Sequence, residues 1–427
     1  MKRLSKFLWL CATALVIVGC ASDKHSNSPF NYDEDVDYRS SDYDDGGEGN
    51  NGAGGEEQEY AGKVTAGEWR DLDHWDLWSE LMTNPDYGKQ SLQNDTQQTN
   101  YNNEENNPYD FTTYSDYWEF YTNNRIAVRL SDAAGLPVGD VRVRLMRDNG
   151  GERTVLYTGR TDNRGEVNLW IGLTQRLIDA GNGLVLVADG AEELANVAVT
   201  GWGSEVQWNE MTTTATFSKK MDIAFIVDAT GSMSDEIDFL KADLQSIIRR
   251  VEQEHSDVAL RTAALFYRDE GDEYLTKASD FSLDINTTVT FISKQNAGGG
   301  GDYPEAVHTA LEKGLQELSW NEEPGIRLVF MLLDAPPHHE TEVIRSLQRS
   351  VPEYAAHGIR VIPVAASGVD KPTEFFLRFV ATATDATYVF LTDHSGVGNS
   401  HIKATVGDYE VELLSDLMVR LINQYME

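Results

Sequence analysis

Three oxygen-bearing side chains at the end of one apolar run could bind a hard cation. Residues 221–234 read MDIAFIVDATGSMS, in which Asp228 ends the run and Thr230 and Ser232 follow at two-residue intervals. One carboxylate and two hydroxyls can converge on one point, and magnesium, manganese and calcium ions prefer such oxygen ligands. The same stretch also fits a helix start, because Ser232 and Asp235 form a capping-box pattern.

Two later loops carry further candidate ligands. Four consecutive glycines at 298–301 precede Asp302, and glycine permits backbone conformations that are closed to other residues. Pro304 suits the first turn of a helix, so Asp302 could either ligate an ion or cap that helix. In the third loop, Asp334 follows an apolar run. If the three loops meet, the sequence predicts a cation site built on Asp228, Asp302 and Asp334.

From residue 221 onward, continuous apolar runs alternate with segments whose apolar residues recur every three or four positions. The first pattern is typical of parallel strands covered on both faces, and the second of amphipathic helices. Strands are expected at 223–227, 258–266, 326–333, 359–365 and 387–391, and helices at 237–251, 305–318, 342–357, 372–382 and 409–425. This alternation predicts an α/β fold with a doubly wound, mostly parallel sheet. Its ligand sites belong outside the carboxyl ends of the strands, where all three loops lie.

The order and spacing of these loops resemble the metal-ion-dependent adhesion site of the von Willebrand factor A domain family. That site has a first loop of D-x-S-x-S, a threonine in the second loop and an aspartate at a strand end in the third. The resemblance covers residues 219–427, and it assigns Asp228, Thr230 and Ser232 to the first loop and Asp334 to the third. It implies a Rossmann-like domain that holds a divalent cation, Mg²⁺ first, with Mn²⁺ and Ca²⁺ as alternatives.

The second loop departs from the family pattern, because Asp302 stands where threonine is usual. A third carboxylate leaves less net positive charge on a bound ion, so we expect firmer ion retention and weaker or different ligand capture. In the family, the open position on the ion takes a carboxylate oxygen from a protein partner. The resemblance therefore implies protein recognition or adhesion in which no bond is broken.

Sequence patterns of common enzymes are missing. Residues 231–234 lack the second glycine of a nucleophile elbow, and the chain has no G-x-x-x-x-G-K-S/T segment for a nucleotide. His338 and His339 are adjacent, so they lack the four-residue spacing of a zinc-binding H-E-x-x-H helix. A polar rim beside the ion site is the simpler interpretation of these histidines. We therefore expect no catalytic activity.

The N-terminus carries an export and lipidation pattern. Basic residues precede an apolar run at 7–18, which is too short and too close to the N-terminus for a membrane-spanning helix. The run closes on IVGC, which resembles the bacterial lipobox and implies a signal peptide at 1–19 and lipidation of Cys20. Ala21 and Ser22 fit sorting to the outer membrane in the cell envelope, with the membrane face left open.

Residues 20–62 predict a disordered, acidic tether. They are rich in aspartate, glutamate, serine, asparagine and glycine, and they cannot bury enough apolar surface to offset the entropy of ordering. Across all 427 residues, 70 acidic and 35 basic side chains give a formal net charge of -35. That charge argues against nucleic acid as a partner, because the phosphate backbone would be repelled. Membrane contact is expected through the lipid anchor alone.

Two further regions lie between the tether and the α/β domain. Residues 63–123 contain two aromatic clusters that predict either a packed pad or an exposed binding platform, and packing is favoured because large aromatics are more often core. Residues 124–218 alternate with period two, which predicts a small β-sandwich that begins with a hairpin of strands near 126–130 and 141–145. Further strands are expected at 155–157, 167–170, 184–187 and 197–202. This region resembles the carboxypeptidase regulatory-like domains, which implies a spacer or stabiliser.

Two functional hypotheses remain open at this stage. In the first, a lipid-anchored envelope protein uses a divalent cation to capture a protein partner that presents a carboxylate. In the second, the protein is a structural or assembly factor of an envelope complex, and the metal only stabilises the fold.

Overall fold

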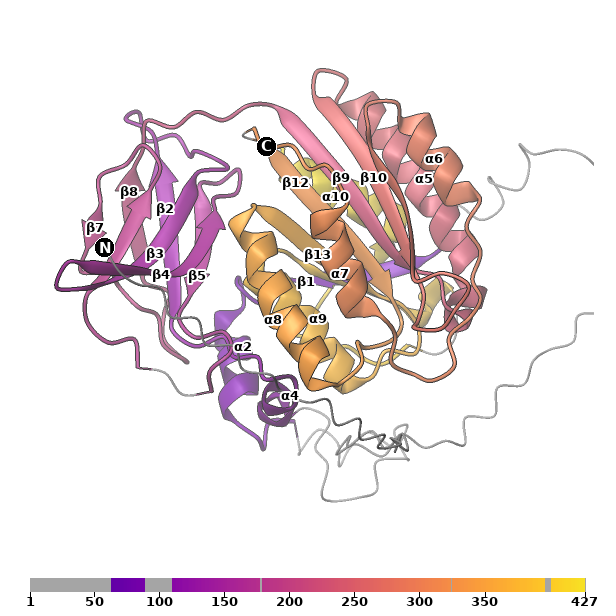
Figure 1. Ribbon diagram of the computed structural model, residues 1–427, viewed down its shortest axis with the longest axis horizontal. Helices are drawn as coiled ribbons and strands as arrows, with labels where there is room; N and C mark the ends of the chain where they lie inside the picture. Colours follow the sequence, from indigo (N-terminus) through magenta and orange to yellow (C-terminus); the bar gives the residue numbers. More distant parts are fainter. Residues whose placement is uncertain (1–62, 89–109, 177–178, 324, 396–400, 427) are drawn as a thin grey trace, which may run out of the picture. The chain divides into compact units, whose positions relative to one another are not determined.

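The computed structural model describes residues 63–88, 110–176, 179–323, 325–395 and 401–426 (Figure 1). The expected signal peptide at 1–19, the lipidation site at Cys20 and the acidic tether at 20–62 lie outside these residues. Within the described ranges, no helix has both the length and the apolar character needed to cross a membrane.

An eight-stranded sheet forms the centre of the α/β domain (Figure 1). Its five parallel strands lie in the order β10-β9-β12-β13-β14. Their bounds are β9 Lys220–Asp228, β10 Ala259–Tyr267, β12 Ile326–Leu333, β13 Ile359–Ala365 and β14 Tyr388–Leu391. Antiparallel strands extend both edges, with β11 (Thr276–Ser282) beside β10, and β1 (Thr65–Trp69) and β15 (Glu412–Leu413) beyond β14. The large, mostly parallel sheet predicted from the sequence is confirmed, and the edge strands are additions to it.

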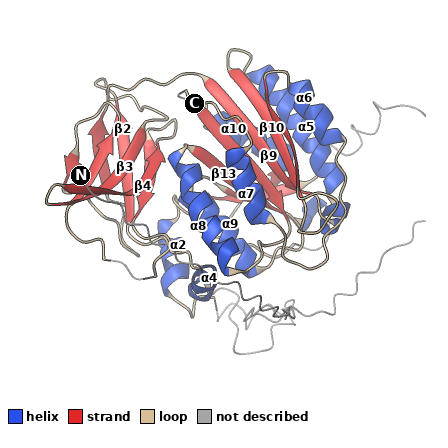
Figure 2. Cartoon of the chain, viewed as in Figure 1, coloured by secondary structure: helices blue, strands red, loops and turns tan. Residues whose placement is uncertain are grey.

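Helices cover both faces of this sheet (Figure 2). One face carries α5 (Ile237–Glu254), α6 (Ile285–Ser293) and α10 (Leu414–Gln424), and the other carries α7 (Val307–Gln316), α8 (Thr341–Ala356) and α9 (Lys371–Ala383). The apolar stripe of α5 is buried, as its three-to-four-residue spacing predicts. Coverage on both sides explains why β9 and β12 are apolar at consecutive positions.

The winding of the chain reverses at β9. This strand lies between β10, which follows it through α5, and β12, which the chain reaches later through α7 on the other face. In doubly wound sheets, ligands bind outside the carboxyl ends of the strands at such a switch point. The topology therefore predicts a ligand site at the carboxyl ends of β9 and β12.

The aromatic-rich segment adds a strand and two helices, α2 (Trp75–Thr83) and α4 (Phe111–Trp118), to the α/β domain. Its strand β1 pairs with β14, so the sheet continues beyond the expected limits of 219–427. Trp78 is fully buried and stacks on Phe375 of α9, with ring centroids 6.1 Å apart. The indole nitrogen of Trp118 donates a hydrogen bond to the carbonyl of Pro372 at 2.9 Å. These aromatics are packed core residues rather than an exposed platform.

A buried ion pair joins the same segment to α9. Arg378 is fully buried, and its guanidinium binds the carboxylate of Asp71 through two nitrogens, with Nε 3.0 Å from Oδ2. Glu374, one turn earlier on α9, lies 3.6 Å from the same guanidinium. Charges this deeply buried are stable only with their partners in place.

Residues 125–212 form two small sheets. One contains β5 (Glu166–Trp170), β2 (Arg125–Ser131) and β8 (Trp208–Thr212), and the other contains β4 (Glu152–Arg160), β3 (Arg142–Asn149), β6 (Leu184–Ala188) and β7 (Leu194–Ala195). The expected hairpin is wrong, because β2 and β3 belong to different sheets. Alternation identifies the buried face of each strand, but it does not identify the strand's neighbour. The expected strand at 197–202 contributes only an isolated bridge between Thr200 and Arg125, and β8 was not expected.

Buried polar contacts connect these small sheets to the α/β domain. Arg327 of β12 donates a hydrogen bond to Asp140 at 3.0 Å, and both side chains are buried. The backbone and side-chain amides of Asn168 in β5 donate to the carboxylate of Asp385, which follows α9. The small sheets are therefore packed against the α/β domain. A loosely attached spacer would not make such buried contacts.

We predict that Asp71→Ala lowers the free energy of unfolding by about 3 kcal/mol, because it leaves the buried Arg378 without its main partner. The control is Asp257→Ala, where the side chain is 68% exposed and pairs with Lys219, which is itself 71% exposed. This control should cost less than about 1 kcal/mol. Chemical denaturation of both variants gives the comparison, and equal effects would contradict the role assigned to Asp71.

Candidate metal centre

The predicted first-loop and third-loop residues meet at the carboxyl edge of the sheet. Asp228 is the last residue of β9, and Asp334 follows the last residue of the neighbouring β12. Both side chains are buried. The winding order of the sheet thus brings together two aspartates that are more than a hundred positions apart in the sequence.

Hydroxyl groups link these two carboxylates. Thr230 donates to Asp228 Oδ1 from its backbone nitrogen at 2.9 Å and from its hydroxyl at 2.7 Å, and this hydroxyl lies 3.2 Å from that of Ser232. Ser232 in turn hydrogen-bonds the Asp334 side chain. The other oxygen of Asp228, Oδ2, and Asp334 Oδ1 are buried without a hydrogen-bond partner of good geometry among the described residues. The buried hydroxyl of Tyr267 in β10, which likewise has no such partner, is another neutral group that acts on Asp228. Four of the five predicted ligand residues therefore form one connected group with two unsatisfied carboxylate oxygens.

Backbone hydrogen bonds fix the three loops against one another. The amide of Gly231 donates to the carbonyl of Gly299 at 3.0 Å, and the amide of Gly298 donates to that of Ala229 at 3.0 Å. The glycine loop and the third loop are joined in the same way, because the amide of Glu305 donates to the carbonyl of Pro336 at 2.9 Å. The side-chain arrangement thus rests on a rigid backbone framework.

Asp302 does not occupy the position expected of it. Its side chain is exposed, whereas Glu305, three residues later, is only 3% exposed. Glu305 Oε1 lies 2.9 Å from the point that a Cβ on Gly300 would occupy, and Thr230 Cβ lies 3.5 Å from that point. Glu305 Oε2 is buried without a hydrogen-bond partner in the described structure. The sequence did not point to Glu305, because residue spacing does not show which of two acidic side chains, three positions apart before a helix, faces the site.

A fourth loop, between β10 and β11, also reaches the site and was not expected. Asp272 Oδ2 accepts hydrogen bonds from the amides of Gly300 at 2.9 Å and Asp269 at 3.1 Å. This aspartate fits against Gly299, whose φ is +83° and whose missing Cβ would lie 2.3 Å from Asp272 Oδ2. Asp272 therefore holds the glycine loop in a conformation that only glycine can adopt at position 299.

The two adjacent histidines have separate partners. His338 Nε2 lies 2.7 Å from Asp269 Oδ1 in the fourth loop. His339 stacks on Tyr117 of α4 with ring centroids 3.6 Å apart, and its Nε2 lies 2.6 Å from the Tyr117 carbonyl. The polar rim expected here is present, and it connects the candidate site to the aromatic-rich segment.

Burial and mutual repulsion govern the electrostatics of the carboxylates. Burial raises the pKa of Asp228 to about 6 against the opposing effect of the Thr230 hydrogen bonds. Burial and the charge of Asp228 raise the pKa of Asp334 well above its usual value. Burial raises the pKa of Glu305 to about 10, and the negative charges of Asp228, Asp269 and Asp334 contribute to this rise. A bound cation would relieve this repulsion, since opposite charge favours the ionised form.

A metal site at this edge of the sheet would need hydroxyl ligands in addition to carboxylates. Over the ranges that the structure describes, no three side chains drawn from histidine, cysteine, aspartate and glutamate are arranged so that they could hold an ion. The expected trio of Asp228, Asp302 and Asp334 is therefore not formed. Two carboxylates with the hydroxyls of Thr230 and Ser232 supply the mixed oxygen set that magnesium accepts, with water filling the other positions.

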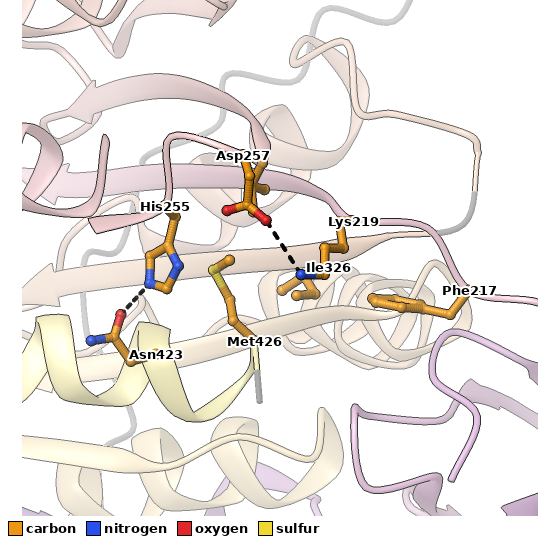
Figure 3. A pocket seen from close by; sticks show the side chains of 8 residues that line it. Phe217, Lys219, His255, Asp257, Ile326, Asn423 and Met426 are labelled. Atoms are coloured by element: carbon orange, nitrogen blue, oxygen red, sulfur yellow. Dashed lines mark hydrogen bonds and ion pairs between the residues drawn. The ribbon is translucent and has the colours of Figure 1, made fainter. Parts of the chain in front are cut away.

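A pocket at the opposite edge of the sheet has no part in this site (Figure 3). Its volume is about 200 Å³, and it is lined by residues near the amino ends of β9, β10 and β12, including Lys219, Val258 and Ile326. Figure 3 shows the hydrogen bond between His255 and Asn423 and the ion pair between Lys219 and Asp257 at its wall. The candidate site is built from loop oxygens at the other, carboxyl edge of the sheet.

Comparison with known proteins identifies the central part of the chain. Residues 222–362 match the profile of the von Willebrand factor A domain. The chain is 33% identical over 131 residues to an ariadne-like RING finger protein of Acanthamoeba polyphaga mimivirus, which is 31% of this chain and 12% of that protein. It is 32% identical over 206 residues to an alpha-protein kinase of Dictyostelium discoideum, which is 48% of this chain and 32% of the kinase. The chain thus spans less than a third of the length of either relative.

We predict that Gly299→Ala destabilises the protein by about 1–3 kcal/mol, because alanine is strained at positive φ and its Cβ meets Asp272. Gly301→Ala, two residues away, is the control, since no atom lies within 4 Å of its Cβ position. That variant should stay within about 0.5 kcal/mol of the wild type. Thermal unfolding of both variants is the measurement. An unchanged melting temperature for Gly299→Ala would refute the conclusion that Asp272 holds the glycine loop in this conformation.

We also predict that stability falls with rising pH when a chelator is present. The pKa of Asp228 is about 6 in the folded protein and 3.8 ordinarily, so the folded state binds more protons than the unfolded state between these values. The contribution is fully present below about pH 4 and is lost as pH rises through 6. Denaturation at pH 4 to 8 should give a shallower fall in stability for Asp228→Asn than for the wild type, and equal slopes would contradict the raised pKa of Asp228.

Proposed function

Because residues 222–362 form a von Willebrand factor A domain, we propose that this domain binds a divalent cation, Mg²⁺ first, and uses it to recognise a protein partner. Asp228, Thr230, Ser232 and Asp334 would hold the ion. The observation that carries the proposal is the pair of unsatisfied buried oxygens, Asp228 Oδ2 and Asp334 Oδ1, in one hydrogen-bonded group. Buried polar atoms normally have partners, so such a pair needs an explanation, and a cation provides one.

When bound, the ion would supply an open coordination position for an oxygen of the partner, and a carboxylate is the group that the family resemblance suggests. The chain's own residues orient that position. The hydrogen bonds of Thr230 fix the Asp228 carboxylate, and the loop-to-loop backbone bonds fix Asp334 relative to it. No step of bond breaking is proposed, so the role is binding rather than catalysis.

The proposed setting is the bacterial cell envelope, with the protein anchored to the outer membrane through a lipid on Cys20. This part rests on the lipobox-like sequence alone. The kinase and RING activities named for the two relatives are not proposed here, because the chain covers only 32% and 12% of those proteins.

A structural role for the metal is the second candidate, and one contact favours it. The third loop continues into His338 and His339, which bind the fourth loop and α4, so an ion at Asp334 would also stabilise the packing of the aromatic-rich segment. In this alternative the protein is an assembly factor of an envelope complex, and the ion stabilises its fold without contacting a partner.

We predict that Asp228→Asn weakens Mg²⁺ binding at least tenfold, measured by isothermal titration calorimetry on the full chain, because it removes a carboxylate from the ion. Asp416→Asn is the control, since Asp416 of α10 is exposed and pairs with Arg250 of α5. Unchanged Mg²⁺ affinity in folded Asp228→Asn would refute the metal site.

Partner recovery separates the two candidate functions. Pull-down from intact cells with the tagged wild-type protein should lose its partner on addition of chelator and with Asp228→Asn. If recovery is indifferent to both treatments while chelator lowers the melting temperature, the structural role replaces the recognition role.

A further inference from the structure

The proposed ion site contains one buried carboxylate that no family motif assigns. Glu305 is 3% exposed, and its Oε2 has no hydrogen-bond partner in the described part of the chain. The charges of Asp228 and Asp334 act on it directly, as do those of Asp269 and Asp272 from the fourth loop. An ionisable group in such surroundings is costly to bury unless something positive compensates it.

The backbone around Glu305 keeps its carboxylate in this place. Its amide binds the carbonyl of Pro336, and it bridges to Pro337, which ties it to the loop that carries Asp334. Gly300 leaves room for the carboxylate, because a side chain at this position would begin 2.9 Å from Glu305 Oε1. Asp272 in turn holds the amide of Gly300. Three loops therefore cooperate to present Glu305 toward Thr230 and the two aspartates.

We infer that Glu305 is the residue that sets the ligand preference of the ion site. It faces the ion bound by Asp228 and Asp334, strengthens the retention of that ion and disfavours an incoming carboxylate. This inference rests on the proposed function and replaces the partner's carboxylate named there with another group. The partner group that suits the site is a neutral oxygen, such as an amide or backbone carbonyl.

Charge balance gives the reason. Asp228 and Asp334 already offset the two positive charges of a magnesium or manganese ion. The bound ion also favours the ionised form of the nearby Glu305, whose added charge leaves the occupied site net negative. A carboxylate ligand would meet repulsion in a poorly solvated environment, where charge interactions are stronger than in water. A neutral oxygen would not meet this repulsion. Asp302, at the exposed surface of the same loop, is screened by solvent and has a much weaker effect.

The test uses the full chain, Mn²⁺ as the ion and acetate as the carboxylate probe. Mn²⁺ affinity is measured by electron paramagnetic resonance for the wild type, Glu305→Gln, Asp302→Asn and Asp228→Asn. We expect Glu305→Gln to weaken Mn²⁺ binding about tenfold, as loss of a group that supports metal ligands does. Asp302→Asn should stay within about twofold of the wild type, because an exposed charge is screened.

Acetate binding to the Mn²⁺-saturated proteins tests the ligand preference. Glu305→Gln should bind acetate several-fold more tightly than the wild type, and Asp302→Asn should not. Equal acetate affinities, or equal losses of Mn²⁺ affinity in Glu305→Gln and Asp302→Asn, would overturn the role of Glu305. Thermal unfolding without metal confirms that each variant is folded.

The Asp228→Asn variant distinguishes failure of the proposed ion site from failure of the inference about Glu305. If it binds Mn²⁺ as well as the wild type, the ion site itself is wrong. If it loses Mn²⁺ while Glu305→Gln matches the wild type in both Mn²⁺ and acetate binding, the ion site stands and only the inference about Glu305 fails.

Discussion

Repulsion among buried carboxylates is the constraint that the loops at the carboxyl edge of the sheet must satisfy. Asp228, Glu305 and Asp334 are buried near one another, and their mutual charge raises the pKa of Glu305 and Asp334 beyond what burial alone does. Carboxyl groups so placed keep a proton unless a compensating positive charge lies beside them. Parallel pairing of β9 with β12 places the two aspartates side by side, and the hydroxyls of Thr230 and Ser232 link them.

The loops that hold these carboxylates are supported from further away. Asp272 fixes the glycine loop through the amide of Gly300, and His338 binds Asp269 beside it. His339 then stacks on Tyr117, so the rim of the site is continuous with the aromatic-rich segment. That segment is secured by the buried pair of Asp71 and Arg378 and by β1 in the sheet. A continuous set of packed and hydrogen-bonded contacts therefore connects residues before 124 with the proposed ion site.

The sequence predicted much of this arrangement. Continuous apolar runs located β9, β10, β12, β13 and β14, because a strand covered by helices on both faces buries every side chain. The same pattern predicted that Asp228 and Asp334 share one sheet edge. The period-two alternation at 126–145 wrongly predicted that β2 pairs with β3, because alternation identifies the buried face of a strand but not its neighbour. The sequence pattern could not identify β1 as part of the sheet, because edge pairing leaves no periodic signal.

Residue types and spacing alone thus determined the α/β domain, its carboxyl-edge loops and the first-loop and third-loop residues Asp228, Thr230, Ser232 and Asp334. Tertiary structure alone decided which acidic residue of the second loop faces them. The sequence pointed to Asp302, but the backbone bond from Glu305 to Pro336 and the space beside Gly300 turn Glu305 inward, and Asp302 is exposed. The physical reason is that side-chain direction at a loop-to-helix junction depends on contacts between loops that are distant in sequence.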